Sequence, residues 1–169
     1  MRARMLMMTA SLAVLAGACA KPVAVAPVAP LPGMSAPPAP MPGYDWFFNP
    51  DPEEARLAFG LEASDDLRLG LGCRPGSGRL ELSANGPAGG PPEIKIEAGG
   101  EIQTFRAQSE PSQVSDGDFL IAQVAADAAV FRQFRALGWL AVHQGGRRQA
   151  YAPQPGSLGN IDRFFAMCG

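Results

Sequence analysis

Residues 67–73, LRLGLGC, decide the fold of this chain. The three leucines and the cysteine occupy every second position, so a strand places them on one face and the arginine and glycines on the other. The turn sequence PGSG follows at residues 75–78, and the alternation resumes at Leu80 and Leu82. Residues 67–83 therefore predict a β-hairpin with one apolar face.

Further strand signals extend this sheet. Ile94 and Ile96 alternate with charged residues, and Gly99-Gly100 offers a two-residue turn into a strand over 101–107. Residues 139–144 and 147–151 flank Gly145-Gly146 in the same way, and a short strand is expected over 119–124. Short hairpins joined by glycine turns favour an antiparallel sheet.

Three segments have helical signals. Residues 127–137 place apolar side chains on one stripe before a stop at Gly138. Asp51 caps a predicted short helix that runs to Gly60. A last helix, capped by Asn160, carries four residues at i, i+3, i+4 and i+7 on its apolar face: Ile161, Phe164, Phe165 and Cys168. The predicted fold class is α+β, a small antiparallel sheet with two covering helices.

The N-terminus has the pattern of an export signal. Arg2 and Arg4 precede an uncharged apolar run over residues 5–16. The run is too short for a spanning helix, which needs about 20 residues. Small residues then lead to a cysteine in the sequence Ala16-Gly17-Ala18-Cys19, an ending that resembles the lipobox of bacterial lipoprotein signal peptides.

This resemblance implies a lipid anchor. Residues 1–18 would be the signal peptide, and Cys19 would be diacylated and become the new N-terminus. Ala20 after the cysteine implies retention at the outer membrane, facing the periplasm or the exterior. The alternative is an ordinary cut after Ala18 or Ala20, which also satisfies the A-x-A rule and would give a soluble periplasmic or secreted protein.

The other cysteines fit an exported protein. With Cys19 assigned to lipid, Cys73 and Cys168 are left as an even pair, and such a pair in an exported domain predicts one disulfide. Both lie on apolar faces of their elements, so they point into the same core. They lack the C-x-x-C spacing of redox-active thiols.

A spacer separates the anchor from the domain. Proline recurs throughout residues 20–43, which excludes a helix interior or a central strand. Together with Cys19 this segment forms the lipidated linker, 19–43, which would reach about 70 Å if fully extended at about 3.1 Å per residue. Residues 44–169 then form one α+β domain of ordinary size. The alternative for residues 20–43 is a disordered tail with no further role.

The net charge of the mature domain and its lack of known catalytic motifs narrow the range of possible functions. The mature domain keeps its 16 acidic residues but loses three of the chain's 14 basic ones, which argues against nucleic acid as a partner. No nucleophile elbow, phosphate-binding loop or dinucleotide motif occurs. The single histidine, His143, has no nearby ligand partner, so neither a metal nor a cofactor is expected.

Two features are candidates for binding. Arg147 and Arg148 follow the glycines of a predicted hairpin tip, where they would hold an anion or a carboxylate. The alternative is a solvated turn. Trp46 belongs to the aromatic segment YDWFF at residues 44–48, a candidate partner-binding strip whose alternative is docking onto the core.

Two functions follow from these observations. The first is a lipid-anchored, non-enzymatic envelope protein that binds another envelope protein or a glycan, or serves as a structural or accessory module. The second is an envelope enzyme that acts on cell-wall or small substrates through carboxylates, although no acidic pair is marked by its spacing.

Overall fold

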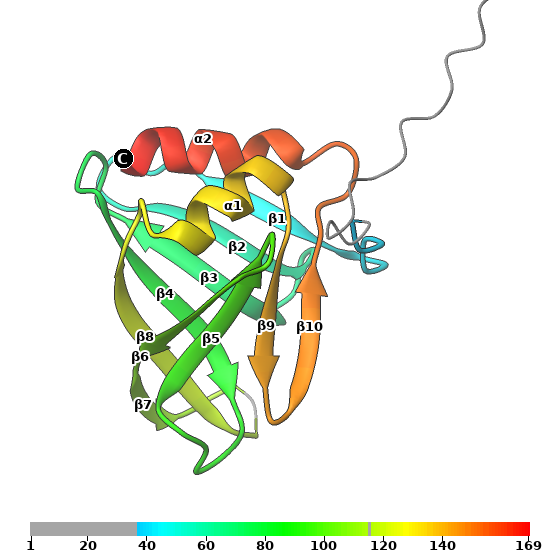
Figure 1. Cartoon of the computed structure of the whole chain (residues 1–169), viewed down its shortest axis with the longest axis vertical. Helices are drawn as coiled ribbons and strands as arrows, with labels where there is room; N and C mark the ends of the chain where they lie inside the picture. The colour runs from blue at the N-terminus through cyan, green and yellow to red at the C-terminus, as the bar shows by residue number, and fades with distance from the viewer. Residues whose placement is uncertain (1–36, 115) are drawn as a thin grey trace, which may run out of the picture. The chain divides into compact units, whose positions relative to one another are not determined.

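The computed structural model describes residues 37–114 and 116–169 (Figure 1). Two antiparallel sheets and two helices form this part of the chain. The α+β fold class predicted from the sequence is confirmed. The signal-like segment, Cys19 and most of the spacer lie outside the described residues.

The larger sheet has six strands in the order β1-β2-β3-β4-β8-β7. Each strand pairs with its neighbour in antiparallel fashion. The predicted hairpin over 67–83 forms the centre of this six-stranded sheet. Its strands are β1 (Tyr44–Asn49), β2 (Ala55–Leu61), β3 (Leu67–Cys73), β4 (Arg79–Gly86), β7 (Gln108–Pro111) and β8 (Asp118–Ala125).

The smaller sheet has four strands in the order β10-β9-β5-β6. Both predicted glycine-turn hairpins are present in it. Its strands are β5 (Glu93–Ala98), β6 (Glu101–Arg106), β9 (Leu140–Gln144) and β10 (Arg147–Tyr151). Only the buried Ala107 separates β6 from β7, so the chain passes from one sheet into the other at this residue.

Two helices lie side by side over the strands (Figure 1). Helix α1 (Ala129–Leu137) packs on β5 and β6, whereas α2 (Leu158–Cys168) packs on β1 and β2. Gly138 ends α1 as predicted. It takes a left-handed conformation with φ of 76°, and its N–H donates to the carbonyl of Phe134 at 2.8 Å.

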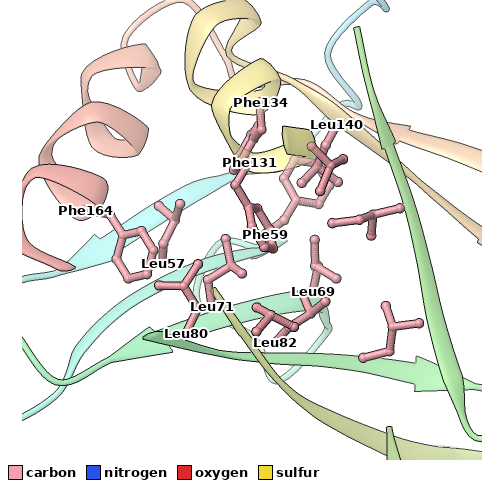
Figure 2. Packing of buried hydrophobic residues seen from close by; sticks show 14 of the residues in the cluster. Leu57, Phe59, Leu69, Leu71, Leu80, Leu82, Phe131, Phe134, Leu140 and Phe164 are labelled. Atoms are coloured by element: carbon pink, nitrogen blue, oxygen red, sulfur yellow. The ribbon is translucent and has the colours of Figure 1, made fainter. Parts of the chain in front are cut away.

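Aromatic rings from both helices fill the core beneath them. Phe131 and Phe134 of α1 and Phe164 of α2 point toward the leucines of β2, β3 and β4 (Figure 2). The four residues predicted on the apolar face of the last helix are all buried. Burying side chains of this size contributes roughly 1.5–3 kcal/mol each. The helix-covered core therefore supplies much of the stability of the domain.

A disulfide staples this end of the molecule. Cys73 at the end of β3 is bonded to Cys168 at the end of α2, with 5.7 Å between the Cα atoms and 95 positions between the residues. The predicted pairing is confirmed. In the β3–β4 turn, the N–H groups of Gly76 and Gly78 donate to the carbonyls of Met167 and Cys168, each at 2.9 Å. We call the region under α1 and α2, with this bridge, the closed end.

One predicted helix is wrong. The chain after Asp51 enters β2 rather than a helix. The Asp51 carboxylate accepts hydrogen bonds from the N–H groups of Glu53 and Glu54, as a helix cap would, but these bonds close only a local turn. Leu57 and Phe59 are both buried, and two residues apart they lie on one face of a strand.

The cap of the last helix also differs from the prediction. Helix α2 begins at Leu158, before Asn160. The Asn160 side chain instead donates to the carbonyl of Trp46 at 2.8 Å. This amide therefore ties α2 to the edge strand β1.

Candidate functional site

A polar opening of about 340 Å³ lies between β10 and the start of β3. We call it the arginine mouth, and no acidic side chain is among its lining residues. These residues are Arg68, Val142, Gln144, Arg147, Arg148, Gln149 and Tyr151. Its volume is at the lower end of the range for small-ligand pockets.

The register of the β9–β10 hairpin explains why five of these side chains converge, whereas Arg148 pairs with His143 and belongs to the opposite face of the hairpin. Tyr151 pairs with Leu140, Gln149 with Val142, and Arg147 with Gln144. Successive pairs of this set lie two residues apart, so all of them share one face of the hairpin. Tyr151 and Val142 belong to the core, and Arg147 continues their face outward to the hairpin tip.

A break in strand pairing directs the third arginine to the same place. Phe59 pairs with Leu69 and Gly60 with Leu67, which leaves Arg68 as an extra residue in β3. Such a bulge re-aims a side chain relative to the regular alternation. The Arg68 guanidinium donates to the Tyr44 hydroxyl at 2.9 Å and to the Asp66 carboxylate at 2.8 Å.

Two of the arginines are fixed by carboxylates outside the lining of the mouth. Asp66 holds Arg68 and also accepts a hydrogen bond from the Tyr44 hydroxyl. Glu97 accepts two hydrogen bonds from Arg148, at 2.8 and 2.9 Å. The hydrogen bonds that Arg68 donates to Tyr44 and that Arg148 donates to Glu97 raise the pKa values of both guanidinium groups, which stay charged.

Glu97 has a carboxyl group whose pKa is strongly lowered. Its hydrogen bonds with Arg148 and, to a lesser degree, with His143 at 2.8 Å lower its pKa to about 2, against an opposing effect of burial. The carboxylate is 17% exposed, so its partners are only partly screened by water. This ion pair spans β9 and ties β10 to β5.

Arg147 differs from its two neighbours in the mouth. It is exposed, and within residues 37–114 and 116–169 no carboxylate forms an ion pair with it. Its positive charge is thus not offset by a bonded carboxylate. The sequence identified Arg147 and Arg148 as candidates, and the structure brings both to one opening.

Tyr151 forms part of the floor. The residue is 3% exposed, and its ring stacks on Phe59 with 4.6 Å between centroids. Burial raises the pKa of its hydroxyl, and Arg68, Asp66 and Tyr44 also act on it electrostatically. Tyr151 and Arg68 could not be identified from the sequence, because neither the sheet-to-sheet contact nor the bulge has a signal in the local sequence.

Trp46 lies elsewhere, in the core. It is fully buried and packs against Phe59 and Phe134, with 5.3 and 5.0 Å between ring centroids. Its indole N–H donates to the carbonyl of Tyr151 at 3.4 Å. The segment 44–48 therefore docks onto the core as β1, and Trp46 has no exposed surface through which to bind a partner.

A second hollow lies on the outer face of the larger sheet. Gly70 and Gly72 of β3 form its middle, and Glu54 and Glu81 lie on its borders. A Cβ at Gly70 would lie 2.5 Å from Oγ of Ser83, so glycine allows this close approach. Glu54 binds Arg56 at 2.6 Å and Glu81 accepts from Gln123 at 3.2 Å, so these two carboxylates are already engaged.

Comparison of the chain with models of known protein families, with curated proteins and with solved structures finds no significant match. Among the described residues, no cluster of histidine, cysteine or acidic side chains has the arrangement of a metal site. Neither of the two helices in the described part of the chain is long and apolar enough to cross a membrane.

Proposed function

We propose that this protein is a lipid-anchored binding module of the bacterial cell envelope, attached to the outer membrane through Cys19. The observation that carries the proposal is the Cys73–Cys168 disulfide between two buried cysteines. Structural disulfides persist in oxidising compartments outside the cytoplasm. The disulfide therefore agrees with the export signal that ends at Cys19.

The proline-rich segment 19–43 serves as the spacer between lipid and domain. Its composition favours extended backbone, which would lift the domain off the bilayer. The first strand, β1, begins at Tyr44, directly after this segment. The domain then presents its polar openings to soluble or surface-bound partners in the envelope rather than to the lipid.

Intact mass of the protein from its native host tests the anchor. We expect a chain that begins at Cys19 and carries two or three acyl groups, with a gain of about two daltons on reduction of the disulfide. A lipid-free mass that begins at Cys19 or Lys21 would contradict the anchor and indicate a soluble exported protein.

Fractionation of a variant gives an independent test. Cys19→Ala removes the sulfur that lipid modification requires and leaves residues 44–169 unchanged. We expect this variant to leave the membrane fraction, whereas a Cys73→Ser/Cys168→Ser control that still carries Cys19 stays with membranes. Retention of the Cys19→Ala protein in the membrane fraction would overturn the proposal.

A further inference from the structure

The arginine mouth combines three features of an anion-binding site. It is hollow, it has three guanidinium groups among its lining residues, and none of the lining residues is acidic. The mature domain as a whole carries an excess of acidic residues, so this concentration of positive charge departs from the average surface. Charge of one sign in a cleft attracts ligands of the opposite sign.

The Tyr151 hydroxyl is an independent indication. The side chain is almost entirely buried, and within the described part of the chain the hydroxyl makes no hydrogen bond. Buried tyrosine hydroxyls ordinarily have a hydrogen-bond partner. Because no fully enclosed polar atom of the described residues lacks a partner, this hydroxyl retains access to the opening that Tyr151 lines.

The guanidinium groups are pre-organised to different degrees. Arg68 and Arg148 are fixed by Asp66 and Glu97, which orient them but also offset their charge. Arg147 supplies the unpaired charge at the hairpin tip. Two fixed donors and one adaptable donor suit an acceptor with several oxygens, since guanidinium groups bind carboxylates and phosphates through paired hydrogen bonds.

The floor of the mouth is less polar than its rim. Val142 and Tyr151 are both buried there. A ligand that enters with its anionic group at the arginines would place a small apolar body against these residues. The volume of about 340 Å³ limits that body to a single ring or a group of similar size.

We propose that the arginine mouth binds an oxyanion, a carboxylate or a phosphate, carried on a small apolar group. The anionic oxygens accept hydrogen bonds from Arg147 and from the Tyr151 hydroxyl, while Arg68 and Arg148, oriented by their carboxylate partners, line the opening. This proposal deepens the proposed binding function. It rests on the binding role proposed for the domain, and it does not require the lipid anchor.

Calorimetric titration of the mature, disulfide-bonded protein tests the proposal with three matched probes. Benzoate carries a carboxylate, phenyl phosphate a phosphate, and benzamide is the neutral counterpart of benzoate. We expect saturable binding of at least one anion and binding of benzamide that is weaker by about tenfold or more, the range for a charge-assisted hydrogen bond. The tighter anion identifies the class of headgroup. Equal binding of benzoate and benzamide, or no binding of either anion, would overturn the proposal.

Variants locate the bound anion. Arg147→Gln removes a charge without breaking an ion pair of the described residues, and Tyr151→Phe removes only the hydroxyl and retains the ring stacked on Phe59. We expect each variant to weaken binding of the preferred anion, by about tenfold for Arg147→Gln. Arg106→Gln, an exposed arginine outside the mouth, is the control and should bind as the unmodified protein does. Unchanged affinity in both mouth variants would place the anion elsewhere and contradict the proposal.

The proposals of a lipid anchor and of an oxyanion site can be refuted independently of each other. A lipid-free mass from the native host would remove the anchor and leave the titration result standing. If a protein that carries lipid at Cys19 binds neither benzoate nor phenyl phosphate, the oxyanion site is refuted and the envelope location still stands.

Discussion

The closed end and the arginine mouth are two regions of one core that are stabilised in different ways. At the closed end, aromatic rings from α1 and α2 and the Cys73–Cys168 bridge lie over a leucine-rich sheet. At the mouth, the buried apolar side chains end, and two of the arginines that line the opening are bound to carboxylates. A single strand, β3, serves both regions, because it carries Arg68 near its start and Cys73 at its end.

This difference separates stability from binding. Apolar burial and a covalent bond at the closed end contribute free energy that depends on no titrating group. The ion pairs at the mouth are partly exposed and contribute little, since such pairs are typically worth about 0–1 kcal/mol. Residues that add little to stability yet occupy fixed positions are the ones that we expect to serve ligand binding.

The largest expected effect comes from breaking the bridge at the closed end. Chain-entropy models give a loop of this length about 4–5 kcal/mol, so the Cys73→Ser/Cys168→Ser variant should unfold at much lower denaturant concentration. Urea titration with and without reductant measures the difference. The single variant Cys19→Ser is the control and should unfold as the unmodified oxidised protein does. A midpoint of the double variant equal to that of the oxidised protein would contradict the account of the closed end.

Two leucines of β3 compare the packing of its buried part with that of its exposed start. Leu71 is 2% exposed beneath the helices, whereas Leu67 is 49% exposed at the opposite end of the strand. We expect Leu71→Ala to lower the free energy of unfolding by about 3 kcal/mol and Leu67→Ala by about 0.5 kcal/mol or less. Equal losses in chemical denaturation would show that the exposed start of β3 carries as much of the packing energy as its buried part, and would contradict the account of the closed end.

Acid should weaken the mouth before it affects the packing of the closed end. The pKa of Glu97 is about 2 in the folded protein, below its ordinary value of 4.5, because Arg148 and His143 stabilise the carboxylate. The resulting stabilisation is present above pH 4.5 and is lost as the pH falls from about 4.5 to about 2. Solvent screening at the partly exposed Arg148 reduces the full effect, so we expect a loss of about 1 kcal/mol.

Unfolding measured at pH 5 and at pH 2.5 checks this value. In Glu97→Gln the loss between the two pH values should be smaller, since an amide does not titrate. Glu101→Gln, at an exposed position of β6, serves as the matched control and should keep the loss of the unmodified protein. An identical loss in the Glu97→Gln protein would exclude this ion pair as its source.

The smallest expected effect on stability is that of Arg147→Gln. The residue is exposed at a hairpin tip and forms no ion pair with the described residues, so its replacement should change the free energy of unfolding by less than about 0.5 kcal/mol. Thermal unfolding measures this change. A destabilisation of 2 kcal/mol or more would assign Arg147 a structural role and weaken its assignment to binding.

The sequence predicted the parts of the fold that depend on local pattern. The alternation of residues 67–73, the glycine turns at 99–100 and 145–146, and the apolar stripe of α2 all have one dominant periodicity. The pairing of Cys73 with Cys168 followed because both fell on apolar faces. In each case the tertiary structure agrees with the local preference of the chain.

The features that could not be predicted from the sequence depend on contacts between distant segments. Residues 52–60 begin with good helix signals, but pairing with β1 and β3 and the burial of Leu57 and Phe59 favour a strand. The sequence likewise gave no sign of two separate sheets or of the bulge that turns Arg68 toward Tyr44. It identified Arg147 and Arg148 from their turn, but it left out Arg68 and Tyr151, which meet them only in the folded chain.

A titration followed residue by residue in a nuclear magnetic resonance spectrum tests the division between the two regions most directly. We would add the preferred anion to the mature protein and follow the backbone amide signals. The account predicts saturable shifts at Arg68, Gln149 and Tyr151 and none along α2. Shifts concentrated in α2 or in the outer hollow around Gly70, with the mouth unchanged, would contradict it.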